Sequence, residues 1–451
     1  MQSVSNERRG QYRRIAVIGS GVAGLSAAWL LSQDHEVVLY EADRRLGGHS
    51  NTVQVATPAG AVSVDTGFIV YNEGNYPNLT AMLAHLEVAT EASDMSFAAS
   101  LDNGRVEYSS VGFNGLIGQR RNMFRPRFWS MLRDVLRFYR QAPGLLVNPE
   151  LVDVTLGEYL DTHGYTEAFI TDHLLPMGAA IWSTTAREMR DYPLLAFVRF
   201  FMSHGLLQAD VNRRPIWRTV KGGSASYVAR LAATPLARIG ARVVDVRRLG
   251  TAVEVTDAAG HSDRFDDVVI AAHADQALAM LGDADDAERS VLGAFSYTDN
   301  TAVLHTDVGL MPKRRRVWAS WNYIGDTSSG EETQLCVSYW MNRLQNLDPA
   351  HPIFVTLNPG RPVAEGHLIE AIHYTHPLFD MAALSAQSRL PQLQGRGGVW
   401  FCGSYFGYGF HEDALQAGLS VAEAVGGRSR PWRVAASANR IAETPRSTAL
   451  A

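Results

Sequence analysis

Residues 14–53 contain a strand, a glycine turn, a helix and a second strand in direct succession. Ile15–Ile18 is a short β-branched run, which is typical of a buried parallel strand. Gly19, Gly21 and Gly24 follow it with G-x-G-x-x-G spacing. In such a turn the first glycine permits the bend, the second lets the backbone approach a pyrophosphate, and the third lets the helix pack on the strand. This order of elements predicts a dinucleotide-binding α/β unit.

The helix is expected from Val22 to about Ser32, with its free N–H groups and positive dipole end directed at the phosphates. Val37–Tyr40 is expected to form the second strand, which Glu41 ends. A carboxylate at this place accepts both hydroxyls of an adenosine ribose and disfavours a 2′-phosphate. The unit therefore predicts these dinucleotide contacts: Gly19, Ser20, Gly21, Val22, Ala23, Gly24, Glu41 and Ala42.

The segment after Glu41 favours FAD over NAD. Arg45-Leu46-Gly47-Gly48-His49 resembles the R-x-G-G-R extension of flavoproteins in the amine oxidase and phytoene desaturase superfamily. That resemblance implies that Arg45, Gly47, Gly48 and His49 approach the FAD pyrophosphate. His49 stands where arginine is commoner, so the charge at this position depends on pH.

Further motifs extend the resemblance over residues 14–425: VDTGFIVYN, TVKGGSASYVARL and FCGSYFGYGFHEDALQAG. The chain resembles the FAD-binding amine oxidase superfamily, and is most similar to a bacterial branch of NAD/FAD-binding oxidoreductases. Members of that branch are often encoded beside cyclopropane-fatty-acyl-phospholipid-synthase-like methyltransferases, and some are implicated in desaturating methylated fatty acyl chains. By this resemblance, the further cofactor residues are Asp65, Thr66, Gly67, Val243, Val244, Gly403, Ser404, His411, Asp413 and Ala414. Without it, the segment at Asp65–Gly67 reads equally well as a plain turn.

The predicted fold class is α/β: a discontinuous Rossmann-like FAD-binding domain of the amine oxidase (GR2) type with an inserted α+β substrate domain. The expected FAD-binding segments are 14–75, 212–290 and 395–427, the substrate-domain segments are 76–211 and 291–394, and residues 1–13 and 428–451 are expected to be disordered tails. Residues 76–211 are predicted to be largely helical, with runs at Asn78–Glu87, Phe128–Gln141, Leu156–His163 and Pro193–His204. Residues 294–390 are predicted to form an antiparallel sheet from Ala302–His305, Val317–Trp321, Leu335–Met341, Phe354–Leu357 and Ile369–Tyr374.

The segment Gln119–Arg140 is rich in arginine, with aromatic residues between the charges. Its seven arginines are Arg120, Arg121, Arg125, Arg127, Arg133, Arg137 and Arg140, against one acid, Asp134. Such a stretch can lie on an anionic lipid surface. The alternative is a solvated helix face whose aromatic residues enter the core.

Composition excludes several classes of function. A net charge of −5 argues against a general nucleic-acid binder. Cys336 and Cys402 show no metal spacing, no metal site is expected, and the histidines at 373 and 376 have no further ligands nearby. No run of 18 apolar residues occurs and no leader-like apolar segment opens the chain, so we expect a cytoplasmic protein, with possible peripheral contact with the inner membrane.

The last motif supplies the candidate catalytic residues. The resemblance implies that a helix N-terminus near Glu412 faces the flavin edge, where amides stabilise its reduced anion. His411 is the favoured base or proton relay because an unperturbed imidazole titrates near neutral pH, and Tyr405, Tyr408 and Glu412 are the alternatives. Equally, Glu412 and Asp413 can simply cap the helix while His411 orders the loop. Gly403-Ser404 departs from the Gly-Glu of amine oxidases, and Cys402 does not match their covalent flavin cysteine, so noncovalent FAD is expected.

The leading hypothesis is an FAD-dependent oxidoreductase that takes a hydride from a carbon of a fatty acyl lipid to flavin N5. It draws on the resemblance, on the arginine-rich stretch and on the apolar run at Pro193–His204. The alternatives are an amine oxidase acting on a small amine, a redox-neutral FAD-dependent isomerase, and a flavin-binding module without catalysis.

Overall fold

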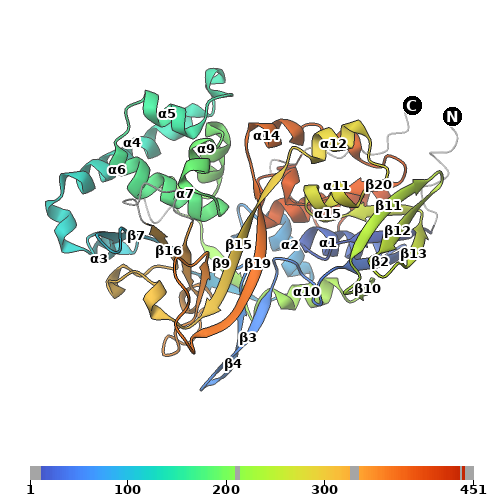
Figure 1. Ribbon diagram of the computed structural model, residues 1–451, viewed down its shortest axis with the longest axis horizontal. Coiled ribbons are helices and arrows are strands. Elements are labelled where there is room, and N and C mark those ends of the chain that lie inside the picture. Colours follow the sequence, from blue (N-terminus) through green and yellow to red (C-terminus); the bar gives the residue numbers. More distant parts are fainter. Residues whose placement is uncertain (1–11, 209–213, 326–334, 437–438, 442–451) are drawn as a thin grey trace.

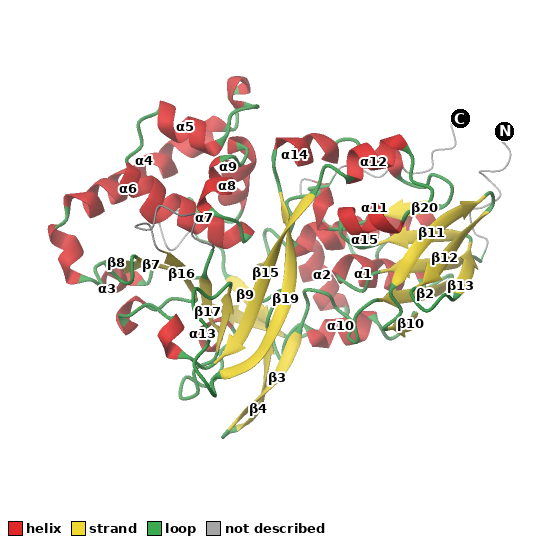
Figure 2. Cartoon of the chain, in the orientation of Figure 1, coloured by secondary structure: helices red, strands yellow, loops and turns green. Residues whose placement is uncertain are grey.

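The computed structural model describes residues 12–208, 214–325, 335–436 and 439–441. It confirms a mixed α/β fold. A lobe of parallel sheet and helices lies on the right of Figure 1 and a helical lobe on the left, and the long strands β15 and β19 pass between them (Figure 2).

The α-helices are α1 (Val22–Leu31), α2 (Pro77–His85), α3 (Gly112–Leu116), α4 (Pro126–Leu145), α5 (Leu156–Thr162), α6 (Glu167–Phe169), α7 (Leu175–Trp182), α8 (Ala186–Arg190), α9 (Leu194–Ser203), α10 (Ala225–Leu231), α11 (Ala274–Met280), α12 (Asp286–Leu292), α13 (Met341–Leu344), α14 (Met381–Gln387) and α15 (His411–Gly426). Short 3₁₀ turns include η1 (Arg120–Phe124), η6 (Arg315–Val317) and η8 (Ser404–Phe406).

The sheet of the right-hand lobe is parallel throughout, with strand order β10-β2-β1-β14-β20. Its strands are β1 (Arg14–Ile18), β2 (Glu36–Glu41), β10 (Leu236–Ile239), β14 (Asp267–Ile270) and β20 (Val399–Phe401). In register, Val17 pairs with Leu39 on one side and with Val269 on the other, and all three side chains are fully buried. Burial on both faces explains why these strands read as continuous apolar runs.

Two glycines let α1 lie close to its neighbours. A Cβ on Gly24 would stand 1.8 Å from the carbonyl oxygen of Gly19, and a Cβ on Gly418 would stand 2.1 Å from that of Ala23. Because neither approach leaves room for a side chain, Gly24 fixes α1 on the glycine turn and Gly418 fixes α15 on α1. The last helix of the described residues, α15, therefore closes the unit that β1 and the glycine turn open.

The second lobe contains a seven-stranded sheet, whose strand order is β19-β15-β18-β17-β16-β7-β8. Its strands are β7 (Phe97–Leu101), β8 (Val106–Ser109), β15 (Ser296–His305), β16 (Trp321–Gly325), β17 (Val337–Trp340), β18 (Phe354–Leu357) and β19 (Leu368–Leu378). All neighbours are antiparallel except β16 and β7. Three smaller sheets complete the described fold. One has the order β5 (Val70–Asn72), β9 (Trp217–Val220), β6 (Thr90–Ser93), and the second has the order β11 (Val243–Leu249), β12 (Ala252–Asp257), β13 (Ser262–Phe265). The third pairs β3 (Thr52–Thr57) with β4 (Gly60–Asp65).

Three expectations need correction. The predicted strand at Val317–Trp321 is wrong, because η6 ends at Val317 and β16 begins only at Trp321. The segment predicted to be largely helical also supplies β6, β7 and β8. Residues 428–436 are no disordered tail: Trp432 stacks on Trp29 at 6.0 Å, and Arg430 forms an ion pair with Glu423. The expected tail residues 1–11 and 442–451 lie outside the described residues, and the domain boundaries stay a prediction.

None of the helices in the described residues combines the length and the hydropathy that crossing a membrane requires.

Candidate active site

A cavity of about 920 Å³ begins at the carboxyl ends of β1, β2 and β14 and continues between the two lobes. One end is lined by the glycine turn and its surroundings, including Gly19, Gly21, Glu41 and Val244. The carboxyl edge of a parallel sheet is where α/β folds bind dinucleotides. The cavity therefore starts at the place that the sequence predicts for the cofactor.

The N-terminus of α1 is suited to an anion. Gly21 is its N-cap residue, no side chain caps the helix, and its first turn holds no acid. A Cβ on Gly21 would meet nothing within 4 Å, so the space beside this residue is left open by the protein itself. Free N–H groups, a positive helix end and this open space fit the pyrophosphate of FAD, which the turn would hold.

Glu41 is oriented by the turn that it faces. Its carboxylate accepts hydrogen bonds from the Ser20 N–H at 2.9 Å, from the Ser20 hydroxyl, and from the Asp43 N–H at 2.8 Å. Each carboxylate oxygen has further lone pairs, so these bonds hold Glu41 at the cavity wall without using up its capacity to accept ribose hydroxyls.

Most of the predicted site residues line the cavity. They are Gly19, Ser20, Gly21, Val22, Ala23, Glu41, Ala42, Gly47, Gly48, His49, Thr66, Gly67, Val243, Val244, Gly403, Ser404, Tyr405, Tyr408, His411 and Ala414. Their contacts with FAD stay a prediction.

Gly24, Arg45 and Asp65, three of the predicted cofactor residues, do not line the cavity. Gly24 serves helix packing. Arg45 lies 3.5 Å from the Asp43 carboxylate. Asp65 is buried, and its carboxylate accepts hydrogen bonds from Thr52, Ser224 and Gln345, so it holds together the segments beside the cofactor end of the cavity.

Glu412 and Asp413 also lie outside the cavity lining, which corrects their predicted roles. The fully buried Glu412 carboxylate accepts from the backbone N–H groups of Asn78 at 2.9 Å and Leu79 at 3.0 Å, and so caps α2. Asp413 accepts from the N–H groups of Tyr408 and Phe410, which fixes the loop before α15. The structure thus gives both acids structural contacts in place of catalytic or cofactor contacts.

His411 does line the cavity, and its ring is held on two sides. Nε2 lies 2.8 Å from the Tyr227 hydroxyl, which in turn lies 2.5 Å from the Ser50 hydroxyl. The imidazole stacks on Phe68 with ring centroids 3.8 Å apart. Burial lowers the pKa of His411 to about 3, so the expected titration near neutral pH is wrong and the ring is neutral at working pH.

A cluster of aromatic and histidine rings lines the cavity near Gly48, and most of it escaped the sequence analysis. His49 stacks on Tyr374 at 4.8 Å and lies 5.3 Å from His376 and 6.3 Å from His273, measured between ring centroids. Burial lowers the pKa of each of these three histidines. His49 Nε2 is buried without a hydrogen-bond partner among the described residues, which leaves it available to a bound group.

The cluster is no metal centre. In the part of the chain that the structure describes, no group of three or more His, Cys, Asp or Glu side chains is arranged to hold a metal ion.

The far end of the cavity is apolar. Its walls include Trp182 on α7, Phe200 on α9, Trp321 on β16 and Tyr339 on β17, with aliphatic side chains such as Leu357 between them. Asn322, Trp340 and Asn342, on or next to the same strands, do not line the cavity. Among the described lining residues, the only Asp, Glu, Lys or Arg side chains are Glu41, Asp43 and Arg242, all at the dinucleotide end.

Comparisons with known proteins agree with this geometry. A family model for NAD(P)-binding Rossmann-like domains matches residues 17–86. AofH of Mycobacterium tuberculosis, which is named as a flavin-containing monoamine oxidase, is 30% identical over 272 residues, covering 55% of this chain and 54% of AofH. The chain thus spans about half the length of the curated relatives it matches.

Two solved structures share the fold over nearly their whole length. A fatty acid isomerase from P. acnes matches with a TM-score of 0.63 and 17% identity, covering 90% of this chain and 97% of the isomerase. Wild-type putrescine oxidase bound to putrescine matches with a TM-score of 0.63 and 14% identity, covering 93% of this chain and 100% of the oxidase.

The fold and the cavity define the class: the chain carries a Rossmann-type dinucleotide-binding unit whose cavity fits FAD. Within that class, the Rossmann match, the sequence relatives and the shared fold support the FAD-dependent amine oxidase superfamily, with FAD as the cofactor.

Proposed function

We propose that this protein is an FAD-dependent oxidoreductase that removes a hydride from a carbon of a fatty acyl lipid. The observation that carries the proposal is the apolar far end of the cavity, where no charged side chain stands among the described lining residues. An acyl chain carries no charge along its length, so such a space can bury it without leaving a charge unpaired. A polyamine would bring ammonium groups to a wall that has no carboxylate to pair with them, and burying an unpaired charge is costly.

FAD, when bound, supplies N5 of its isoalloxazine as the hydride acceptor. The protein residues would bind the substrate and handle the proton. Trp182, Phe200 and Leu357 would hold the acyl chain and exclude water. As the hydride leaves, the positive charge that develops on the substrate makes the neighbouring C–H strongly acidic, so a base as weak as the buried, neutral His411 would take its proton. The Tyr227 and Ser50 hydroxyls would orient the His411 ring.

The balance of this step is complete with FAD as the only oxidant. One C–H bond gives its electron pair as hydride to the flavin, the adjacent C–H bond gives its proton to the base, and the electron pair left behind forms the new C=C bond. The product is two hydrogens lighter than the substrate.

A second candidate is a redox-neutral isomerase acting on an unsaturated acyl chain. The same apolar cavity favours it, and the fatty acid isomerase with this fold supports it. An isomerase returns the hydride to the substrate, so product mass equals substrate mass and no acceptor is consumed.

The test is turnover of the purified flavoprotein with saturated and unsaturated fatty acyl phospholipids and, separately, with polyamines, followed by mass analysis and peroxide detection. Loss of two hydrogens from the acyl chain supports dehydrogenation. A moved double bond at unchanged mass assigns the isomerase. Turnover of polyamines alone, with peroxide release, overturns both lipid hypotheses.

A further inference from the structure

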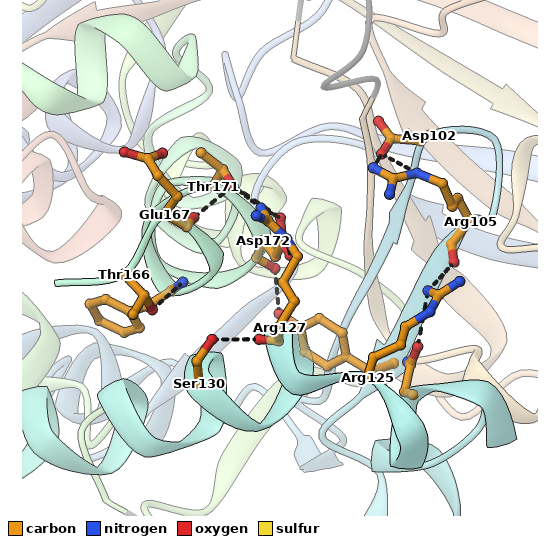
Figure 3. A network of polar contacts seen from close by, with 12 residues as sticks. Asp102, Arg105, Arg125, Arg127, Ser130, Thr166, Glu167, Thr171 and Asp172 are labelled. Carbon is orange, nitrogen blue, oxygen red and sulfur yellow. Dashed lines mark hydrogen bonds and ion pairs between the residues drawn. The ribbon is translucent and has the colours of Figure 1, made fainter.

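Four of the seven arginines of Gln119–Arg140 lie at or before the start of α4 and fall into two groups, of which the first is bound to the protein itself. Arg127 donates to both carboxylate oxygens of Asp172, at 2.8 Å each, and Arg125 donates to the Arg105 carbonyl at 2.7 Å. Figure 3 shows both guanidinium groups directed at these partners. These two arginines join the start of α4 to neighbouring segments, so they are poor candidates for binding a partner.

Arg120 and Arg121 form the second group. Both are exposed on η1, and within the described residues neither side chain has a hydrogen bond or ion pair. No Asp or Glu occurs between residues 108 and 133. The acids nearest in sequence are already paired, Asp102 with Arg105 and the buried Glu107 with Arg314. The charge of η1 is therefore not offset locally.

A second basic segment, distant in sequence, lies beside this one. The 3₁₀ turn η6 packs against α3. Its residue Arg316 also lies close to Gly118, which stands two residues before η1: Arg316 Cγ is 3.5 Å from the point that a Cβ on Gly118 would occupy. Arg316 is exposed and, among the described residues, forms no ion pair. The fold thus adds a third free cation to the pair on η1.

Aromatic side chains stand exposed among these cations. Phe124 is 84% exposed, Phe113 on α3 is 71% exposed and Trp129 on α4 is 53% exposed. The Trp129 Nε1–H donates to the Met123 carbonyl at 2.9 Å, so its polar edge is satisfied and its ring offers an apolar face. Exposed apolar side chains that gather on one face mark an interaction site, whereas scattered single ones do not.

We propose that Phe113, Arg120, Arg121, Phe124, Trp129 and Arg316, here called the apical patch, dock the protein on an anionic phospholipid bilayer. Charge complementarity supports this partner, because the patch is locally cationic on a chain of net charge −5. The aromatic rings support it too, since rings flanked by arginine enter the headgroup boundary of a bilayer. The proposal stands apart from the proposed chemistry, because lipid docking is measured without substrate turnover.

The test is cosedimentation of the FAD-loaded protein with neutral phosphatidylcholine vesicles and with vesicles that also contain phosphatidylglycerol. The first variant is R120Q/R121Q/R316Q. Its matched control is R230Q/R289Q/R433Q, which removes the same total charge from exposed arginines outside the patch. The second variant is F124A, with L368A as the control for loss of an exposed apolar side chain, since Leu368 on β19 is 55% exposed. Flavin absorbance of each variant confirms that it is folded.

We expect the wild type to sediment with the anionic vesicles only, and the patch triple variant to bind them at least roughly tenfold more weakly than its control. F124A should bind more weakly than L368A. The proposal is overturned if the wild type ignores anionic vesicles, if it binds neutral vesicles equally well, or if the patch and control triple variants lose the same affinity.

Discussion

The Tyr227 hydroxyl lies 2.8 Å from Nε2 of His411, so a residue of α10 orients a ring at the start of α15, 184 positions further along the chain. Tyr227 is fully buried, and burial raises the pKa of its hydroxyl, which therefore stays protonated. The contact joins α10, which follows the segment Lys221-Gly222-Gly223, to the first residue of α15. It is the only hydrogen bond between His411 and another side chain in the described part of the chain.

Removing this hydrogen bond should slow flavin reduction without releasing FAD. We expect Tyr227→Phe to lower the rate of flavin reduction by substrate roughly fivefold, because one hydrogen bond to a positioned group is worth about 1 kcal/mol. Tyr192→Phe is the matched control, since the Tyr192 hydroxyl is also buried without a partner among the described residues and Tyr192 does not line the cavity. Stopped-flow reduction rates at equal flavin occupancy decide the matter, and equal rates for the two variants would remove Tyr227 from a positioning role.

Gly21 and Gly24 should respond differently to the same substitution. A Cβ on Gly21 would meet no protein atom within 4 Å, so the Gly21→Val apoprotein should fold with nearly unchanged Tm but bind no FAD. Gly24→Val places a side chain on the Gly19 carbonyl, so it should reduce stability or prevent folding. Thermal unfolding of the apoproteins and FAD titration separate the two effects. A Gly21→Val protein that retains full FAD affinity would show that the pyrophosphate lies elsewhere.

Glu41→Arg should largely abolish FAD retention. The substitution replaces a ribose acceptor by a cation and also removes the acceptor of the Ser20 and Asp43 bonds, a combined loss of a few kcal/mol. Glu150→Arg, at an exposed position on the short turn at residues 149–151, controls for the change in net charge. Flavin-to-protein absorbance ratios after purification give the result, and a ratio like that of the wild type would contradict the ribose assignment.

Stability should fall in acid because of buried histidines. Burial lowers the pKa of His376 to about 4, while the unfolded chain titrates near the ordinary value of about 6.5. Between these values the unfolded state binds more protons, so the stability that this residue gives is complete above about pH 6.5 and is lost as pH falls toward about 4, a change of about 3 kcal/mol.

His376→Asn should therefore flatten the decline of Tm with falling pH. His373→Asn, three residues away on the same strand with an exposed side chain, is the control and should leave the slope unchanged. Equal slopes for the wild type and both variants would contradict the account.

Local patterns predicted the cofactor end of the cavity because its residues are close in sequence. Gly19, Gly21 and Glu41 belong to one strand-turn-helix-strand unit, whose geometry is set by the glycines and by the apolar runs. The long-range elements could not be predicted in this way. His273 and His376 are 103 positions apart and meet His49 only through the packing of β19 beside the end of β14.

The sequence patterns also could not predict where individual side chains point. The position of Glu412 at a helix start predicts an exposed acid or a cap on its own helix, yet its carboxylate caps α2. Arg127 reads as a free surface charge in sequence, because its partner Asp172 is 45 residues away. The exposed cations and the paired ones become distinguishable only when the fold is known.

The most direct test of the central claim is anaerobic mixing of the purified flavoprotein with fatty acyl phospholipid, with the visible flavin bands followed over time. Dehydrogenation of an acyl chain predicts stoichiometric bleaching with phospholipid and none with putrescine. Bleaching with putrescine alone, or unchanged flavin bands with every acyl lipid, would contradict it.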